Sequence, residues 1–366
     1  MGKKIRKVAK LALASALAIL LAALATGLVY RAYRQRQVEK LLAIDTPDGI
    51  DEAMFVKIDG ADQWITIRGR HRNNPVVLMI HGGPGVTNEG FAANFLPWEK
   101  DFTVVQWDQP GAGRTFARAG RKLPADLTIN SIATDGIAVA EFLKTHLHKD
   151  RLILLGWSWG SIVGIDMVQA RPDLFAAYVG TGQFENVQAG ESIVYARVLA
   201  AARAKGNTQA IKDLESIGPP PYRTQADLGT QRRWAMTLEG SPTPIAELIG
   251  VALFGPRSSL EDGWSFLSGV VASQNHFWGP MMDGEFAKVD LSADHTHFAI
   301  PIFVIQGVDD NMTPAELAHD YVEKISAPQK AYIPIEGAGH LAIISNSREF
   351  LKAMNERVRP LAAASL

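Results

Sequence analysis

Cysteine is absent from this chain of 366 residues. Its absence excludes disulfide bonds, thiolate metal sites, a cysteine nucleophile and a lipid-modified N-terminal cysteine. An excess of charge of either sign is also lacking, because 37 basic and 38 acidic residues leave a formal net charge of -1. A nucleic-acid-binding protein needs a basic surface, so we expect no nucleic-acid partner. Apolar residues, at 47%, are plentiful enough for the core of one large domain with an insertion.

The longest stretch without charged residues, residues 11–30, lies near the N-terminus. A helix of about 20 residues spans about 30 Å, which is the hydrocarbon thickness of a bilayer. The apolar region of a secretory signal peptide is shorter, so we favour an uncleaved signal-anchor, a transmembrane helix within residues 1–36. The alternative is a secreted protein, released by cleavage after Ala25 in the sequence Ala23-Leu24-Ala25.

Basic residues flank this stretch unevenly, with five before it and three directly after it. The bias favours an N-terminus on the inside, which places the remaining chain on the exoplasmic side, the periplasm in a bacterium. The membrane is therefore an expected partner, through the N-terminal helix. The basic residues are Lys3, Lys4, Arg6, Lys7 and Lys10 on one side and Arg31, Arg34 and Arg36 on the other.

Residues 35–49 are expected to form a polar connector that starts as a helix and stops at Pro47 and Gly49. After it, apolar runs alternate with helical patterns. This rhythm predicts a mostly parallel, twisted sheet with helices on both faces. The organisation we predict is a core in two parts, 37–180 and 298–366, with a helical insertion at 181–297. Strands are expected at 53–58, 63–68, 75–80, 102–107, 151–156, 175–179, 301–306 and 331–335. Helices are expected at 91–100, 131–147, 162–170, 314–325 and 346–358 in the core, and at 194–205, 230–238 and 245–254 in the insertion.

The stretch at 156–160 reads Gly-Trp-Ser-Trp-Gly, which is a G-x-S-x-G pattern at the end of a buried strand. Such a turn from strand to helix lifts Ser158 clear of the sheet, and small residues at Gly156 and Gly160 avoid collisions with the flanking elements. Ser158 is therefore the predicted nucleophile.

A serine hydroxyl needs a base, and that base needs a partner that fixes its tautomer. Functional groups in parallel sheets gather beyond the carboxyl ends of the strands. His340 follows the last predicted strand and Asp310 follows the one before, so we predict His340 as the base and Asp310 as the acid. The order Ser, Asp, His along the chain is that of the α/β-hydrolase fold. Asp309 is the alternative acid, with Asp310 then capping the next helix.

Acyl transfer also needs donors for the oxyanion, and the predicted donors are the backbone N–H groups of Gly83 and Trp159. Gly83 follows a buried strand within His81-Gly82-Gly83-Pro84, and Trp159 follows the nucleophile. We expect no metal, and we interpret the acidic and histidine residues at 290–297, namely Asp290, Asp294, His295 and His297, as surface groups. Arg114, Asp135 and Glu336 are interpreted as solvated or salt-bridged residues.

Three motifs together resemble the proline iminopeptidase-like serine aminopeptidases of the α/β-hydrolase superfamily. They are His-Gly-Gly-Pro-Gly at 81–85, Asp-Gln at 108–109 with Gly111 and Gly113, and Gly-Trp-Ser-Trp-Gly at 156–160. The resemblance implies a helical cap between the sixth and seventh core strands, and Ser158, Asp310 and His340 as the triad. One departure is Pro110, which stands where the family's Asp-Gln-Arg-Gly pattern has arginine.

These features predict a serine hydrolase that cleaves an ester or amide of a small molecule or short peptide, without a cofactor. An aminopeptidase of the resembled family is favoured, and a carboxylesterase is the alternative. A substrate ammonium would need an acidic group in the cap, for which Glu185, Glu191 and Glu239 are candidates. A protein of another class, a hydrolase-like binding module without catalysis at the membrane, is the remaining alternative. The oligomeric state is left open.

Overall fold

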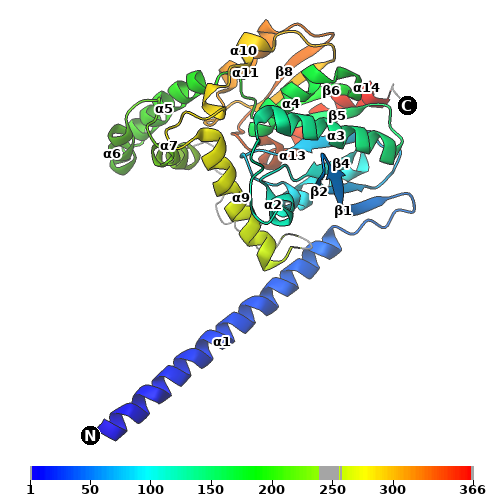
Figure 1. The fold of residues 1–366 in the computed structure, drawn as a ribbon. Coiled ribbons are helices and arrows are strands. Elements are labelled where there is room, and N and C mark those ends of the chain that lie inside the picture. Colours follow the sequence, from blue (N-terminus) through cyan, green and yellow to red (C-terminus); the bar gives the residue numbers. More distant parts are fainter. Residues whose placement is uncertain (1, 239–254, 256–257, 364–366) are drawn as a thin grey trace.

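The computed structural model describes residues 2–238, 255 and 258–363. A long N-terminal helix leads into a body built on one sheet (Figure 1). The sheet has eight strands in the order β1-β2-β4-β3-β5-β6-β7-β8. The strands are β1 (Ile50–Ile58), β2 (Ala61–Gly69), β3 (Val76–Ile80), β4 (Thr103–Trp107), β5 (Leu152–Trp157), β6 (Phe175–Thr181), β7 (Ile302–Gly307) and β8 (Lys330–Ile335).

The first two strands form an antiparallel hairpin, and β2 pairs antiparallel with β4. The other pairs, from β4 through β3 to β8, are parallel, so the predicted mostly parallel sheet is confirmed. The hairpin turn is two residues long, Asp59 with φ 44° and Gly60 with φ 80°. Both angles are positive, as in the type I′ turn that suits the twist of a hairpin.

Alternate residues of the parallel strands enter two separate apolar cores, one on each face of the sheet. Leu78 and Ile80 of β3 join the core that α3 (Ile129–Leu147) and α4 (Trp159–Ala170) cover. Val77 and Met79 of the same strand join the opposite core. Because side chains in a strand alternate between faces, an unbroken apolar run identifies a strand that is covered on both sides.

The opposite core is covered by short and irregular helical segments, and here the structure differs from the prediction. The helix expected at 91–100 is two 3₁₀ turns, η1 (Glu89–Phe95) and η2 (Trp98–Lys100). Pro97 stands between them, and proline has no N–H to continue a helix. The helix expected at 346–358 is α13 (Ser347–Ala353) followed by a π-helical turn, η5 (Met354–Val358), and α14 (Arg359–Ala363).

The stretch between β6 and β7 is helical, as predicted, and lies to one side of the sheet (Figure 1). Its described helices are α5 (Val187–Ala204), α6 (Thr208–Ile217), α7 (Gln225–Leu238), α9 (Leu260–Trp278), η4 (Phe286–Lys288) and α10 (Leu291–Asp294). The expected helices at 194–205 and 230–238 fall within α5 and α7, apart from residue 205, whereas α6 and α9 were not predicted. The expected helix at 245–254 lies outside the described residues, and the domain boundaries stay a prediction.

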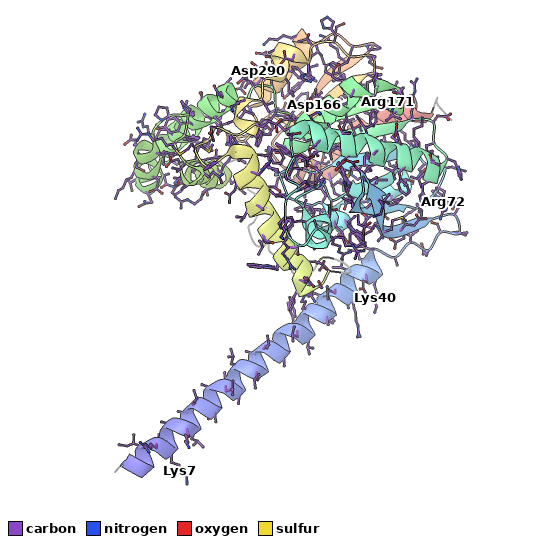
Figure 2. The ribbon with its side chains drawn as sticks, in the orientation of Figure 1. Lys7, Lys40, Arg72, Asp166, Arg171 and Asp290 are labelled. Atoms are coloured by element: carbon purple, nitrogen blue, oxygen red, sulfur yellow. The ribbon has the colours of Figure 1, made fainter. Side chains whose placement is uncertain are left out.

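The N-terminal helix α1 (Gly2–Leu41) continues into the connector at 35–49, in agreement with the helical start predicted for that connector. Residues 35–41 contain no glycine or proline, so nothing in them ends a helix. Its segment Ile5–Leu41 is long and apolar enough to cross a membrane, and none of its most apolar window is buried in the body. Basic side chains lie near both ends, with Lys7 towards the free end and Lys40 where the helix meets the body (Figure 2).

The remaining short elements connect these layers. They are α2 (Gly113–Arg118), η3 (Pro172–Leu174), α11 (Ala315–Lys324) and α12 (Ala342–Ser345).

Candidate active site

Ser158 lies on a strained turn between β5 and α4. Its φ of 55° and ψ of -123° fall in a region that residues other than glycine rarely adopt. The flanking glycines are required by close packing, because a Cβ on Gly160 would lie 2.1 Å from the carbonyl oxygen of Ile80. A Cβ on Gly156 would lie 2.7 Å from the carbonyl oxygen of Gly160. The turn therefore holds the serine in one fixed conformation.

The structure brings the predicted base and acid to this serine. His340, after β8, has its Nε2 3.0 Å from Ser158 Oγ. Its Nδ1 lies 3.0 Å from Oδ2 and 3.1 Å from Oδ1 of Asp310, which follows β7. A neutral imidazole with its proton on Nδ1 would donate to the carboxylate and accept from the serine hydroxyl.

The Asp310 carboxylate is fully buried and saturated with donors. Oδ1 accepts hydrogen bonds from the backbone N–H groups of Met312 and Thr313, at 2.7 and 2.8 Å. Oδ2 accepts one from the Thr313 hydroxyl at 2.7 Å. Burial alone would raise the pKa of Asp310, but the neighbouring His340 and these hydrogen bonds outweigh burial, so the pKa lies below its ordinary value. Asp310 therefore stays charged.

Asp309, the alternative acid, has an exposed side chain, so the contact to His340 belongs to Asp310. Two residues of the acid's surroundings were not predicted from the sequence, Thr313 and Gln306. Gln306, in β7, donates from Nε2 to the carbonyl oxygen of Thr313 and accepts at Oε1 from the N–H of Gln183. The spacing Asp-x-x-Thr was the available signal for Thr313, since aspartate often binds backbone N–H groups two or three residues further on.

The two predicted oxyanion donors lie beside the serine. Gly83 lines the same cavity as Ser158, and Trp159 is the first residue of α4, where backbone N–H groups have no partner within the helix. The Trp159 ring packs against Phe277 and Phe286 of the insertion, with centroids 4.5 and 5.0 Å apart. The partial positive charge of the helix N-terminus favours an anion at this point.

The motif residues His81 and Gln109 hold the loops around the two predicted oxyanion donors together. His81 Nε2 accepts from the backbone N–H of Gln109, and the Gln109 side chain donates to the carbonyl oxygen of His81. Gln109 Oε1 accepts from the Trp159 indole N–H at 3.1 Å. Burial lowers the pKa of His81 to about 4, so His81 is neutral and acts as a structural residue.

A cavity of about 330 Å³ opens over Ser158 between the sheet edge and the insertion. Arg232 of α7 is the one charged residue among the described residues that line it. Behind it, the Arg232 guanidinium forms an ion pair with Glu191 Oε1 of α5. Burial raises the pKa of Glu191 in spite of Arg232, and Glu191 Oε2 has no hydrogen-bond partner within the described structure. Other lining residues are Phe184, Leu228, Gln274, Trp278 and Met312.

Glu185, another candidate for an acidic cap group, lies outside this cavity. Its carboxylate faces Lys324 Nζ at 3.4 Å. Glu239 lies outside the described residues. Pro110, the departure from the family pattern, is buried and lines a separate cavity bordered by the β1–β2 hairpin.

The polar residues at 290–297 have structural partners. Asp290 caps α10 and accepts from Asn186, and His295 Nε2 lies 3.1 Å from Asp166 Oδ1. Across the described parts of the chain, no group of three histidine or acidic side chains is placed to hold a metal ion.

Two of the three polar residues set aside above, Arg114 of α2 and Asp135 of α3, are paired as well. Arg114 lies over the Trp64 ring and within 3.6 Å of Glu89, and Asp135 accepts from Gln63 at 2.6 Å. Burial raises the pKa of Asp135 to about 6.

Comparison with known proteins identifies the family. Residues 77–353 match the model of the alpha/beta hydrolase family. The proline iminopeptidase of Xanthomonas citri is 37% identical over 287 residues, which cover 74% of this chain and 84% of that protein. The probable aminopeptidase YbaC of Bacillus subtilis is 29% identical over 309 residues, covering 83% of this chain and 95% of that protein.

Solved structures show the same fold. The proline iminopeptidase of Mycobacterium smegmatis superposes with a TM-score of 0.58 at 18% identity, covering 86% of this chain and 100% of that one. The resemblance inferred from the three motifs is thus confirmed. The chain is a hydrolase that belongs to the alpha/beta hydrolase family, as a proline iminopeptidase-like member.

Proposed function

We propose that the chain is a serine hydrolase in which Ser158, His340 and Asp310 act as a catalytic triad. The observation that carries this proposal is the continuous chain of contacts from Ser158 Oγ to His340 Nε2 and from His340 Nδ1 to Asp310, at 3.0 Å each. Catalytic groups in serine hydrolases are recognised by this geometry and not by their positions in the sequence.

In the proposed reaction, Ser158 Oγ attacks the carbonyl carbon of an ester or amide while His340 Nε2 takes the hydroxyl proton. The backbone N–H groups of Gly83 and Trp159 stabilise the oxyanion of the tetrahedral intermediate. His340 then returns the proton to the leaving alcohol or amine, which leaves an acyl group on Ser158. Water attacks this acyl-enzyme with His340 again as the base, and the carboxylic acid is released. Asp310 stabilises the imidazolium in both steps.

We further propose an aminopeptidase that removes a small N-terminal residue from a short peptide. The relatives named as proline iminopeptidases and as an aminopeptidase support this substrate class. A substrate ammonium needs a negative partner, and among the described acidic residues we favour Glu191. It contacts Arg232, which lines the cavity, and its Oε2 has no hydrogen-bond partner within the described structure. Buried charges are stable only when they are paired.

Ester hydrolysis is the second candidate, and the lining of the cavity supports it. The charged group that lines the cavity is the guanidinium of Arg232 and not a carboxylate, within the described part of the chain. A neutral or anionic ester would fit such a surface better than an ammonium.

A fluorophosphonate probe tests the triad. We expect the probe to label the wild type and not Ser158→Ala. Equal labelling of the wild type and the variant, or no labelling of the wild type, would contradict the proposal that Ser158 is a catalytic nucleophile. Either result would favour the non-catalytic binding module.

Substrate class is tested by comparing proline and alanine arylamides with short p-nitrophenyl esters. For the aminopeptidase, we expect Glu191→Gln to raise KM for the arylamides by about tenfold, the effect of losing one charge-assisted contact, and to leave the esters nearly unchanged. Glu185→Gln is the matched control, since Glu185 is also buried in the insertion but faces Lys324. Turnover of esters without arylamide cleavage would establish the second candidate instead.

We also propose that α1 stays attached as a membrane anchor and holds the catalytic body on the exoplasmic side. The length and apolar character of Ile5–Leu41 support the anchor, and the excess of basic residues before the apolar stretch supports the orientation.

A further inference from the structure

Residues 260–271 of helix α9, in the insertion, carry a row of large apolar side chains that is turned outwards. Leu260, Trp264, Leu267 and Val271 lie at spacings of four, three and four residues, so they share one face of the helix. Between 55% and 62% of each of these side chains is exposed. Large apolar residues in such a row normally face a core, and a contiguous exposed row marks a binding surface.

The opposite face of α9 holds small residues that pack on the catalytic core. Ser265, Gly269 and Ser273 are buried there, and Ser273 Oγ donates to the carbonyl oxygen of Gly111 at 3.0 Å. A Cβ on Gly269 would lie 2.7 Å from the same carbonyl oxygen, so α9 cannot rotate to bury its apolar row. The outward direction of that row is therefore fixed by the fold.

The start of α9 is bound to the N-terminal helix. Gln35 Nε2 of α1 donates to the backbone carbonyl of Ser258 at 2.7 Å, and the Arg31 guanidinium donates to the same oxygen. Arg31 is the first residue after the uncharged stretch 11–30. If that stretch spans a bilayer, Ser258 lies at the level of the membrane surface, and Leu260 follows two residues later.

The direction of α9 is consistent with a helix that lies along the membrane surface. In Figure 1, α9 runs across the direction of α1 and does not continue it, so that its long side faces away from the body. A helix in this orientation lies in the membrane surface, with its apolar face among the lipids.

The acidic residues near the start of α9 are matched by basic partners from the core. Glu261 pairs with Arg121 at 2.8 Å, and Asp262 lies 3.5 Å from Arg114. These pairs reduce the repulsion that unpaired carboxylates would feel from anionic lipids.

We propose that the apolar row of α9, formed by Leu260, Trp264, Leu267 and Val271, is a docking surface for the lipid bilayer in which α1 is anchored. The inference rests on α1 lying in that bilayer, and it does not depend on the proposed hydrolase chemistry. The row is continuous with the anchor through the contacts of Arg31 and Gln35, which favours lipid over a separate protein partner. Since α9 also supplies Gln274 and Trp278 to the cavity over Ser158, the bilayer would support one wall of that cavity.

The absence of cysteine makes a direct test possible, because any cysteine introduced is the only one in the chain. The full-length Leu267→Cys and Val271→Cys variants are labelled with an environment-sensitive fluorophore and placed in lipid nanodiscs with or without a mixture of two nitroxide lipids, one with the nitroxide near the headgroup and one with the nitroxide near the end of the acyl chain. Glu323→Cys is the control for solvent, because Glu323 is exposed and belongs to α11, which lies on the far side of the body from α1 (Figure 1). Leu20→Cys, in the apolar stretch of α1, is the control for the anchor.

We expect the nitroxide to reduce the fluorescence at 267 and 271 by about twofold, because an interfacial helix enters the bilayer by about 5–10 Å. The label at 323 should be unaffected. Quenching at residue 20 without quenching at 267 and 271 would overturn the docking surface and leave the anchor intact. Absence of quenching at residue 20 would overturn its premise. A blue shift at 267 and 271 that the nitroxide does not reduce, with two protein copies in each nanodisc, would assign the row to a second copy and overturn the lipid proposal.

Discussion

Two buried carboxylates, Asp310 in the core and Glu191 in the insertion, have opposite surroundings. Each lies beside a basic side chain: Asp310 contacts His340, and Glu191 contacts Arg232. Asp310 also accepts hydrogen bonds from two backbone N–H groups and a hydroxyl, and its pKa is lowered. Glu191 has only the arginine, one oxygen lacks a partner within the described structure, and its pKa is raised.

The difference shows which of the two carboxylates already has its hydrogen-bond donors in place before a substrate binds. A carboxylate with all its donors in place needs no rearrangement when charge develops on its neighbour, which is the property that catalysis requires. A buried carboxylate with a free oxygen is unfavourable until a donor arrives, and a substrate or a water molecule can be that donor. We therefore expect the core to control the rate of reaction and the insertion to control the choice of substrate.

The largest effect should come from Ser158, the proposed nucleophile. Ser158→Ala should lower kcat by about 10⁶-fold, and His340→Ala should do the same, because the members of a triad act as a unit. The double variant should lose no more than either single variant. Initial rates on the best ester or arylamide measure this, with circular dichroism as the control for folding. Losses that multiply in the double variant would show that the two side chains work independently.

The next effect should come from the core carboxylate. Asp310→Asn should lower kcat by about 10⁴-fold, because an amide no longer holds the histidine in the tautomer that accepts the serine proton. Asp309→Asn is the matched control: its side chain is adjacent but exposed, and its kcat should stay close to that of the wild type. If Asp309→Asn were the damaging substitution, the acid would be assigned wrongly.

Much of the core could be predicted from the sequence because its signals are local. The largely apolar runs of β3 to β7 identify strands buried on both faces. The glycines around Ser158 identify a tight turn, because a Cβ at either position would collide with neighbouring atoms. The sequence could not decide between Asp309 and Asp310, because two adjacent aspartates of a loop differ only in which one the tertiary fold buries. Thr313 was missed because its role depends on the position of the Asp310 side chain.

The insertion was harder to predict because its signals are tertiary. Over residues 260–273, helix α9 packs on the core through Ser265, Gly269 and Ser273 and exposes Leu260, Trp264, Leu267 and Val271, which is the reverse of the usual helical pattern. Glu191 of α5 and Arg232 of α7 form an ion pair although they are 41 positions apart in the sequence, and no spacing rule predicts a contact between them. The sequence alone therefore indicated that a cap exists but not which side chains line the cavity.

A smaller effect tests whether the donors around Asp310 matter individually. Thr313→Val removes the hydroxyl that donates to Oδ2 and keeps the side-chain shape. The loss of one hydrogen bond to a charged group, about 1.5–3 kcal/mol, should lower kcat/KM by about 10- to 100-fold. Thr313→Ser keeps the hydroxyl and should recover most of the activity. A Thr313→Val variant with the rate of the wild type would mean that the backbone donors alone are sufficient.

The smallest effect is on stability, and its sign should differ between the two carboxylates. Asp310 has a pKa below its ordinary value of 3.8, so its charge stabilises the fold above that value, and the stabilisation is lost as the pH falls through the lowered pKa. Glu191 has a pKa above its ordinary value of 4.5, so ionisation in the folded state costs stability, and this cost grows as the pH rises from 4.5 through the raised pKa.

Thermal unfolding of the wild type, Asp310→Asn and Glu191→Gln between pH 3 and pH 8 measures both signs. The deficit in Tm of Asp310→Asn relative to the wild type should widen as the pH rises, because only the wild type gains from the charge. The deficit of Glu191→Gln should narrow over the same range, because the wild type alone bears the growing cost of ionisation. Parallel slopes for the two variants would mean that Arg232 satisfies Glu191 as fully as the core satisfies Asp310, and the contrast between core and insertion would then not extend to their buried charges.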